Sequence, residues 1–209
     1  MCGRYGLSSP SSQIVEAFQL SEENQILKKA RYNITPCEAI LIINKEKQVL
    51  FPDWGVKHPV NNKLIINARL ESLADSPLWS KAERTVAPAS FFYEWQMSQY
   101  GKKVPWVIMP RKGPFLRLAA LYFPDQNTSV ILTTQACDLL RMIHNHGSNK
   151  HRQPMVLDEF EYNQWLTGEL ETSHYKNKHD SHFSANEIEQ VGDDKKEQPY
   201  REKKQQDLF

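Results

Sequence analysis

Short runs of β-branched and aromatic residues, separated by polar or proline-containing segments, fill the middle of the chain and predict a fold rich in sheet. Runs of this kind, bounded by turn-forming residues, are typical of strands. The predicted strands cover residues 39–43, 49–56, 63–66, 86–95, 104–109, 115–123 and 129–134. Apolar residues at helical spacing predict only short helices. These helices are expected near residues 14–20, 76–83, 138–145 and 158–165.

Length and composition set looser bounds. With 209 residues the chain is long enough for one large domain, or for a domain and a tail. Its formal net charge is +1, so any nucleic-acid site must be a local concentration of Lys and Arg. The three cysteines are odd in number and form no Cys-x-x-Cys pair, which argues against a disulfide framework and a zinc site.

The sequence contains no signal peptide and no apolar run long enough for a membrane span, so we expect neither secretion nor membrane insertion. Unpaired cysteines fit a reducing cytoplasm. From about Glu189 onward the chain is polar with mixed charges, which is the composition of a solvated tail. We therefore expect a folded domain over residues 2–185 and a flexible tail over residues 186–209.

The second residue is a cysteine, which becomes the N-terminal residue if Met1 is removed. It then carries a thiol with a reference pKa of about 8.5 and an α-amine with a pKa near 8 on adjacent carbons. An aldehyde can form a Schiff base with the amine, and the thiol can close this adduct into a thiazolidine ring. The alternative is that Cys2 lies in a frayed terminus and has no function.

Asn67 and Arg69 follow the predicted strand over residues 63–66. If the strand continues through them, their side chains share one face, and loops after strands commonly present polar groups to ligands. If a helix begins here instead, Asn67 is its N-cap and Glu71 lies in its first turns. The local sequence does not distinguish these alternatives.

Glu94 lies between two aromatic residues inside a predicted strand. It is either at a sheet edge in water or partly desolvated with a raised pKa. In the second case it is a candidate general acid and base.

Three histidines, His144, His146 and His151, fall within eight residues at the end of a predicted helix. A charged histidine at a helix C-terminus is stabilised by the helix dipole, which is a purely structural role. The spacing matches no established set of metal ligands. The alternative to a structural role is that one of these histidines takes part in catalysis.

Five segments, in order along the chain, resemble the SOS response-associated peptidase (SRAP) family. They are Met1-Cys2-Gly3-Arg4-Tyr5, Tyr32-Asn33-Ile34-Thr35-Pro36, Asn67-Ala68-Arg69-Leu70-Glu71, Phe91-Phe92-Tyr93-Glu94-Trp95 and Arg152-Gln153-Pro154-Met155-Val156-Leu157. The resemblance covers roughly residues 2 to 170. It implies a single α+β domain with a β-barrel-like, mostly antiparallel core flanked by short helices. It also implies binding of single-stranded DNA and covalent capture of abasic sites as a thiazolidine.

The resemblance also implies roles for individual residues. Cys2 is the nucleophile, Asn67 holds the N-terminal segment, and Glu94 supplies general acid and base catalysis. The family histidine usually stands two residues before the Arg-x-Pro run, where this chain has Lys150, so His144 is preferred and His151 is the substitute. Contacts with DNA, through charge or stacking, are expected from Arg4, Asn33, Pro36, Trp54, Arg69, Trp95 and Arg152.

Two other functions remain open. One is a cysteine peptidase limited to removing its own Met1, and the other is a non-covalent module for single-stranded DNA. The last five residues resemble the peptide by which bacterial repair proteins bind the sliding clamp, with contacts from Gln205, Leu208 and Phe209. We expect a monomer without cofactor or metal, in the cytoplasm at the nucleoid.

Overall fold

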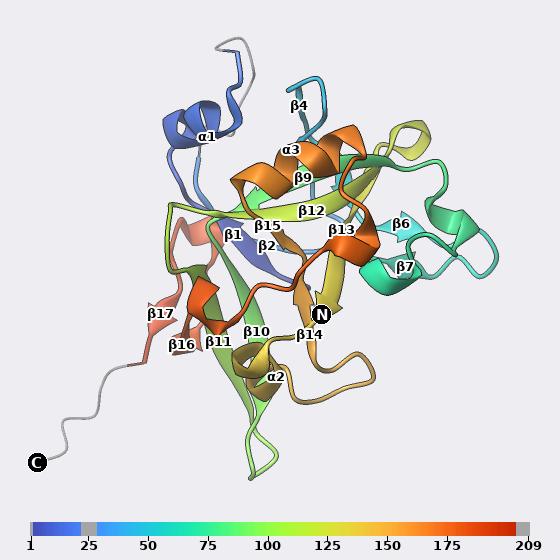
Figure 1. Cartoon of the computed structure of the whole chain (residues 1–209). Helices are drawn as coiled ribbons and strands as arrows, with labels where there is room; N and C mark the ends of the chain where they lie inside the picture. Colours follow the sequence, from blue (N-terminus) through green and yellow to red (C-terminus); the bar gives the residue numbers. More distant parts are fainter. Residues whose placement is uncertain (1, 22–28, 204–209) are drawn as a thin grey trace, which may run out of the picture.

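The computed structural model of the chain describes residues 2–21 and 29–203 (Figure 1). Strands dominate, and the helices are short, as the runs of β-branched and aromatic residues predict. The α-helices are α1 (Ser11–Phe18), α2 (Asp138–Ile143) and α3 (Glu159–Thr167). Among the described residues, no helix has both the length and the apolar character that crossing a membrane requires.

One sheet has six strands in the order β17-β16-β11-β10-β1-β2. Its strands are β1 (Tyr5–Leu7), β2 (Arg31–Ile34), β10 (Phe91–Met97), β11 (Lys103–Pro110), β16 (Phe183–Gln190) and β17 (Arg201–Glu202). Every pairing in this sheet is antiparallel. Strand β10 therefore lies inside the sheet, between β1 and β11.

A second sheet has nine strands along the path β14-β13-β12-β9-β3-β4, with β5, β8 and β15 attached beside it. Its strands are β3 (Ile42–Ile43), β4 (Val49–Leu50), β5 (Asp53–Trp54), β8 (Asn67–Arg69), β9 (Glu83–Ala89), β12 (Leu116–Phe123), β13 (Thr128–Gln135), β14 (Arg152–Pro154) and β15 (Val156–Leu157). Strands β5 and β8 run parallel to β13. A separate ribbon joins β6 (Val56–Lys57) to β7 (Leu64–Ile65).

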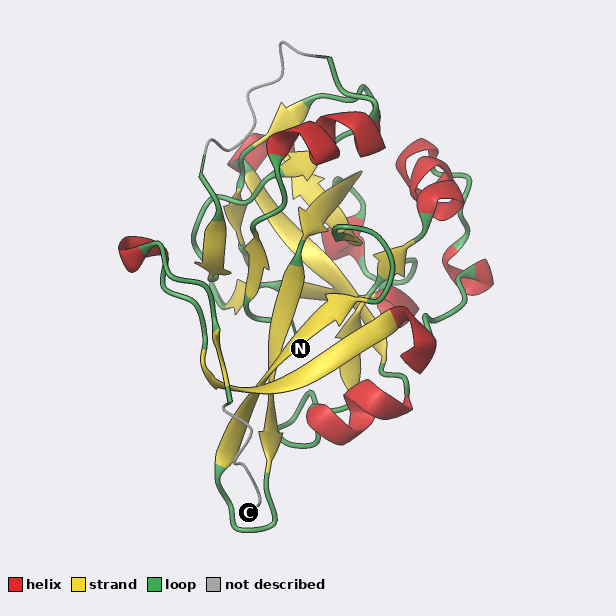
Figure 2. Cartoon of the chain, turned by 90° about the vertical axis from the view of Figure 1, so that its left-hand side faces the viewer, coloured by secondary structure: helices red, strands yellow, loops and turns green. Residues whose placement is uncertain are grey.

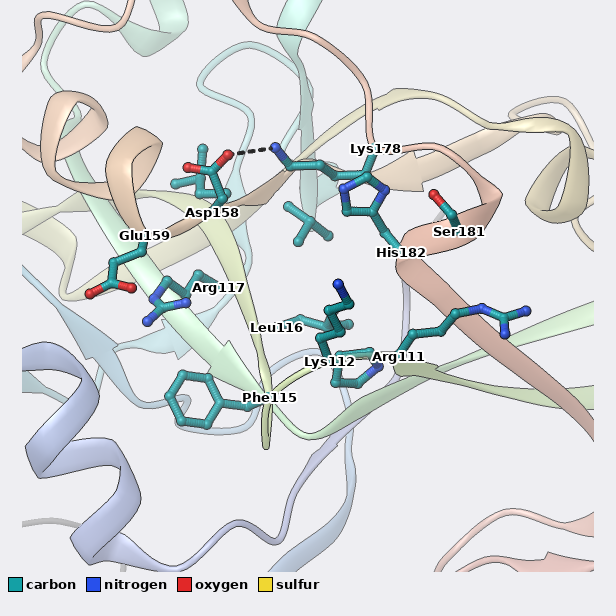
Figure 3. Close-up of a pocket in the computed structure, with 13 residues that line it drawn as sticks. Arg111, Lys112, Phe115, Leu116, Arg117, Asp158, Glu159, Lys178, Ser181 and His182 are labelled. Carbon is teal, nitrogen blue, oxygen red and sulfur yellow. Dashed lines mark hydrogen bonds and ion pairs between the residues drawn. The ribbon is translucent and has the colours of Figure 1, made fainter.

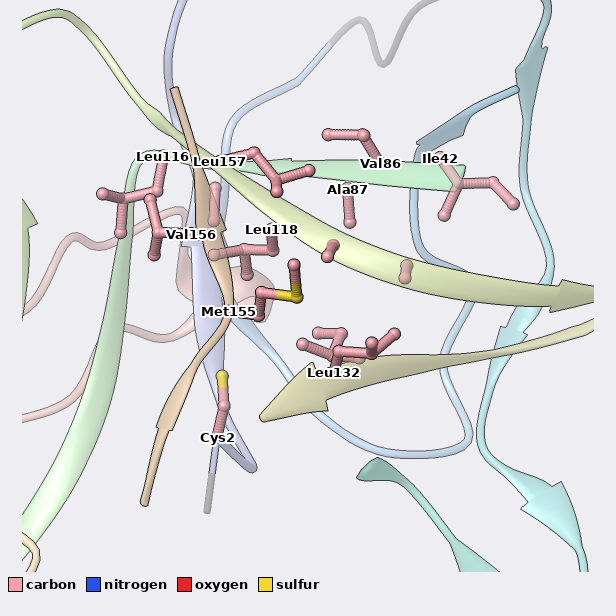
Figure 4. Close-up of a cluster of buried hydrophobic side chains, with 14 of the residues drawn as sticks. Cys2, Ile42, Val86, Ala87, Leu116, Leu118, Leu132, Met155, Val156 and Leu157 are labelled. Carbon is pink, nitrogen blue, oxygen red and sulfur yellow. The ribbon is translucent and has the colours of Figure 1, made fainter. Parts of the chain in front are cut away.

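The chain passes from one sheet to the other at Ser90, between β9 and β10. The Ser90 hydroxyl accepts hydrogen bonds from the backbone N–H groups of Ser8 and Ser9, both at 2.9 Å, so the crossing is tied to the end of β1. The two sheets enclose an apolar core as a half-barrel (Figure 2). Cys2 lies at one edge of this core, with its sulfur directed toward Met155 and Leu118 (Figure 4).

Helix α3 covers the end of the half-barrel away from Cys2. Its sequence explains its bounds, because Asp158 and Glu161 form a reciprocal capping box and Gly168 ends the helix with a φ of 85°. Trp165 is buried and donates from its indole N–H to the Thr85 carbonyl of β9 at 2.9 Å. The helix is thereby fixed to the sheet that it covers.

Four expectations from the sequence are wrong. The single strand over residues 49–56 is three short strands, β4, β5 and β6, and β6 belongs to the separate ribbon. The helix over residues 76–83 is a single 3-10 turn, Pro77–Trp79, and the predicted strand over residues 86–95 is two strands that belong to different sheets. The flexible tail is also wrong for residues 186–203, because β16 pairs with β11 and β17 pairs with β16. Asp194 accepts hydrogen bonds from the backbone N–H groups of Tyr32 and Asn33, which ties this segment to β2. Gln205, Leu208 and Phe209 lie outside the described residues.

Candidate functional site

The start of the chain lies along β10. Tyr5 is opposite Phe92, and the backbone N–H of Tyr93 donates to the Arg4 carbonyl at 2.9 Å, so the same register brings Gly3 opposite Glu94. The Cys2 side chain has no exposed surface. Burial raises the pKa of its thiol well above the usual range, and the nearby charge of Glu94 raises it further. The thiol is therefore neutral at physiological pH.

Glu94 lies on the face of β10 that points toward the core, two residues from buried Phe92, and is 5% exposed. Burial raises its pKa to about 7, although the backbone N–H of Trp95 partly opposes this shift. The sheet-edge alternative is wrong, since β10 has a neighbouring strand on each side. A carboxyl group with this pKa can both donate and accept a proton near neutral pH.

His144 caps the C-terminus of α2 and is 7% exposed. Burial lowers the pKa of its imidazole to about 4, so the ring is neutral and the proposed stabilisation of a charged ring by the helix dipole does not apply. Its Nδ1 lies 3.1 Å from the Arg152 carbonyl oxygen and 3.3 Å from the Arg152 backbone nitrogen. These two contacts with the Arg152 backbone fix the orientation of the imidazole ring.

Asn145 fixes the end of α2 to the strand that carries Glu94. Its side chain accepts from the Met97 backbone N–H at 2.8 Å and donates to the Met97 carbonyl at 3.0 Å. His151 is only partly buried, has a φ of 61° and donates from its backbone to the His144 carbonyl at 2.8 Å. Of the two predicted histidines, His144 is therefore the more deeply buried. The sequence analysis gave no role to Asn145.

Asn67 and Arg69 belong to β8, which runs beside β13, so the strand alternative is confirmed and the helix start is wrong. Asn67 donates to the Ile131 carbonyl at 3.3 Å, and its buried Oδ1 has no hydrogen-bond partner among the described residues. Arg69 is exposed and donates to Asn149 at 2.8 Å, in the loop that follows His144. The shared face thus carries an amide and a guanidinium.

Arg152 is held by a partner that the sequence analysis did not assign. Its two terminal nitrogens lie 2.8 Å from the two carboxylate oxygens of Glu71, and one of them also donates to the Thr133 carbonyl at 2.6 Å. Planar, bidentate pairing of this kind is specific to arginine. Glu71 lies in the same motif as Asn67 and Arg69, which is the signal that could have identified it.

Arg4, Asn33 and Trp95 form a cluster on the outer face of β10. The Arg4 guanidinium carbon lies 5.7 Å from the centre of the Trp95 ring, and one guanidinium nitrogen is 3.4 Å from Asn33 Oδ1. Pro36 is partly exposed in the loop that follows β2. Each of these four residues has some accessible surface.

The expected stacking of Trp54 on DNA bases is wrong. Its side chain has no exposed surface, and its indole N–H donates to the Ile66 carbonyl at 2.9 Å. The ring packs edge-on against Tyr5, with 5.4 Å between the ring centres. Trp54 therefore belongs to the core beneath the N-terminal strand.

A cavity of about 380 Å³ lies beside the C-terminal ends of β11 and β15 (Figure 3). Glu94 and Arg152 do not line it. Lys178 borders it and is paired with Asp158 at 3.3 Å. Its described lining includes none of the predicted site residues. Within residues 2–21 and 29–203, no three His, Cys, Asp or Glu side chains are grouped to hold a metal ion.

Comparison with known proteins agrees with the arrangement of these motifs. The chain is 31% identical over 189 residues to the abasic site processing protein YoqW of Bacillus subtilis, which covers 79% of this chain and 80% of the relative. It is 28% identical over 190 residues to the abasic site processing protein YoaM of the same organism, with 79% of each chain covered.

Two crystal structures share the fold. A protein from Bacteroides thetaiotaomicron matches with a TM-score of 0.74 at 21% identity, covering 90% of this chain and 92% of that chain. A protein from Bordetella bronchiseptica matches with a TM-score of 0.72 at 20% identity, covering 90% and 100%. The family model described as SOS response associated peptidase (SRAP) matches residues 1–196. The chain therefore belongs to the SRAP family.

Proposed function

We propose that this protein processes abasic sites in single-stranded DNA by capturing them covalently on Cys2 after Met1 has been removed. The observation that carries the proposal is the burial of Cys2 beside Glu94, whose pKa is raised to about 7. The curated relatives YoqW and YoaM are named abasic site processing proteins. An amino-thiol supplies both atoms that bond to the aldehyde carbon of a thiazolidine, and an acid that titrates near neutral pH can catalyse the proton transfers.

The chemistry begins at the α-amine of Cys2, because the thiol is held neutral by burial. The amine attacks the aldehyde carbon of the ring-opened sugar, and protonated Glu94 donates a proton to the departing hydroxyl, so that one water is lost and an iminium forms. The carboxylate of Glu94 then accepts the thiol proton while sulfur bonds to the iminium carbon. The net reaction joins the amino-thiol and the aldehyde and releases one water.

Neutral His144 would assist proton transfer at the sugar, and Asn67 would orient the N-terminal segment. The exposed or partly exposed cations and polar groups around Cys2 would hold the flanking DNA by charge and stacking. We assign this role to Arg4, Asn33, Pro36, Arg69, Trp95 and Arg152.

A neutral, buried thiol is a poor nucleophile toward peptide bonds in other proteins. We therefore limit any peptidase activity to the removal of Met1. We further propose that Gln205, Leu208 and Phe209 bind the sliding clamp, with the two apolar side chains in an apolar pocket. Deleting residues 205–209 should abolish clamp retention in a pull-down, and unchanged retention would remove this part of the proposal.

Intact mass spectrometry tests the central proposal. The protein alone should lack Met1, and incubation with an oligonucleotide that contains one abasic site should add the oligonucleotide mass minus one water. The matched undamaged oligonucleotide should add nothing that survives denaturation. Retention of Met1, or the absence of any stable adduct, would overturn the covalent mechanism, and DNA binding without an adduct would support the non-covalent module instead.

A further inference from the structure

The hairpin that joins β10 to β11 extends beyond the body of the protein (Figures 1 and 2). Its last paired residues are Met97 and Lys103. The turn is held by hydrogen bonds from the Ser98 N–H to the Lys102 carbonyl at 2.9 Å and from the Gly101 N–H to the Ser98 carbonyl at 3.0 Å, and Gly101 adopts a φ of 72°. The tip is thus a defined turn that the backbone holds in place.

Tyr100 at this tip is 86% exposed. Its ring contacts no other described aromatic ring, and its hydroxyl has no hydrogen-bond partner among the described residues. An aromatic side chain on a fixed turn loses little conformational freedom when it stacks on a ligand, so its position suits a flat partner. Packing within the fold therefore does not explain why an aromatic side chain stands at this tip.

The charge around Tyr100 is positive. Lys102 and Lys103 follow it and are exposed, and the sequence has no carboxylate between Glu94 and Asp125. Exposed Arg141 lies on α2, whose last turn is tied to the base of the hairpin by a hydrogen bond from Gln96 to the Met142 carbonyl at 3.2 Å. A strand of nucleic acid is the partner that matches flat apolar surface flanked by cations.

The acids on the strand beside β11 do not cancel this charge. Glu187 and Glu189 lie on β16, beside β11, and each is already paired with a cation of the following segment. Glu187 is 2.7 Å from Lys203, and Glu189 is 2.8 Å from Arg201. Exposed Phe160, by contrast, directly follows exposed Glu159, so its neighbour in sequence is a carboxylate, which repels phosphate, and not a cation.

The hairpin is also connected directly to the capture site, because β10 carries Glu94. Tyr100 follows Glu94 by six residues, which places the tip roughly 20 Å away along the strand direction at about 3.3 Å per residue. One DNA strand has a phosphate about every 3.4 Å in a duplex, so this distance corresponds to about six nucleotides, or fewer in an extended single strand. A strand held at Cys2 can therefore reach the tip.

We infer that the tip of the β10–β11 hairpin is a second contact for DNA, where an unpaired base of the strand flanking the lesion stacks on Tyr100 and its phosphates bind Lys102 and Lys103. This inference rests on the proposed function, since it assigns the hairpin to the same DNA strand. The choice of a single strand follows from the exposed ring, because an unpaired base offers its flat face for stacking.

The experiment compares two abasic oligonucleotides, one with two nucleotides on each side of the lesion and one with ten. The wild-type protein should bind the long one more tightly and form the adduct with both. Tyr100→Ala should weaken binding of the long oligonucleotide about tenfold. Each phosphate contact in a single strand contributes about 0.7 to the slope of log Kd against log salt concentration. Replacing both Lys102 and Lys103 by Ala should therefore reduce this slope by about 1.4. Adduct formation with saturating short oligonucleotide should be unchanged in all variants.

Two matched controls keep the test specific. Phe160→Ala removes another strongly exposed aromatic ring, and Lys57→Ala with Lys63→Ala removes two exposed lysines from the β6–β7 ribbon. Both controls should behave as the wild type. Equal binding of the long oligonucleotide by wild type and hairpin variants, or a Tyr100 effect that appears only when the flank is duplex, would overturn the inference. Failure of the proposed function is distinct, since no variant would then form an adduct with either oligonucleotide.

Discussion

The two ends of the half-barrel favour opposite charge states of their ionisable groups. At the end that holds Cys2, burial favours the neutral forms, raising the pKa of Glu94 to about 7 and lowering that of His144 to about 4. At the end covered by α3, the Lys178 ammonium lies 2.6 Å from Glu161 and 3.3 Å from Asp158. Partial burial opposes ionisation of Asp158, but the Glu161 N–H and Lys178 outweigh it, so its pKa lies below the usual range.

We propose that this difference separates groups that serve chemistry from groups that serve the fold. One pKa unit corresponds to about 1.4 kcal/mol, so the shifts of Glu94 and His144 each represent roughly 3 kcal/mol of interaction that favours the neutral form. Strong shifts of this kind concentrate at functional sites. Substitutions at the Cys2 end should therefore change activity, and substitutions at the α3 end should change stability.

The largest effect is expected from Cys2→Ala. The mature variant retains an α-amine but lacks sulfur, so it can form a Schiff base that only borohydride traps, and the stable adduct should disappear completely. Denaturing electrophoresis with and without borohydride measures both species. Cys137→Ser is the control, since serine is a favourable N-cap at the start of α2 and the residue is remote in sequence from the N-terminus. A stable adduct with Cys2→Ala in the absence of reductant would contradict thiazolidine formation.

Glu94→Gln should slow adduct formation by about 10²- to 10⁴-fold, because it removes the general acid and base. The wild-type rate should depend on pH with an apparent pKa near 7, and this dependence should be absent from the variant. Single-turnover rates between pH 5.5 and 8.5 provide the measurement. As a control, Glu161→Gln at the opposite end should lower stability and leave the rate of adduct formation unchanged. If the pH profile of Glu94→Gln is identical to that of the wild type, the pKa near 7 belongs to another group.

Sequence reasoning named Cys2, Asn67, Glu94 and His144 from short motifs, and their roles stay predictions. The strands over residues 104–109, 115–123 and 129–134 are confirmed as β11, β12 and β13, whereas the predicted strand over residues 49–56 is three short strands. The local sequence did not predict the burial of Glu94, because an acid between aromatic residues fits both a sheet edge and a sheet interior. Only the pairing of β10 with both β1 and β11 decides between them for Glu94.

The failures have the same origin in long-range contacts. Trp54 was taken for a surface aromatic, but its exposure depends on β1 packing over it, nearly fifty residues away in sequence. The segment over residues 186–203 is polar because β17 is the edge strand and many side chains of β16 and β17 face water. Its order comes from pairing with β11 and from Asp194 bonding to the backbone of β2, and composition reports neither.

The opposite pKa shifts of Glu94 and His144 predict how stability depends on pH. Folded Glu94 holds its proton between its ordinary value of 4.5 and about 7, so the free energy of unfolding falls as pH rises through this window. Folded His144 stays unprotonated between about 4 and its ordinary value of 6.5, so there the free energy of unfolding rises with pH. Between about pH 4.5 and 6.5 the two contributions nearly cancel.

Single substitutions should reveal each contribution. In Glu94→Gln only the His144 contribution remains, so the free energy of unfolding should rise by up to about 1.4 kcal/mol per pH unit. In His144→Asn only the Glu94 contribution remains, so the free energy of unfolding should fall by a similar amount. The two variants share every other titrating group, so the difference between their slopes, up to about 2.7 kcal/mol per pH unit, isolates these two residues. Urea unfolding at pH 5.0, 5.5 and 6.0 measures it. Parallel slopes would show that burial does not displace these pKa values.

The smallest effect concerns the ion pair at the rim of the site. Glu71 occupies both terminal nitrogens of Arg152, the position that a DNA phosphate would take, so Glu71→Gln should release the guanidinium. We expect affinity for undamaged single-stranded DNA to rise severalfold, the salt slope to increase by about 0.7, and stability to fall by about 1 kcal/mol. Fluorescence anisotropy and urea unfolding measure these quantities. Glu161→Gln breaks a comparable pair at the α3 end and should lower stability without changing DNA affinity. If Glu71→Gln instead weakens DNA binding, Glu71 holds Arg152 in the orientation that phosphate requires, and the pair belongs with the groups that serve chemistry.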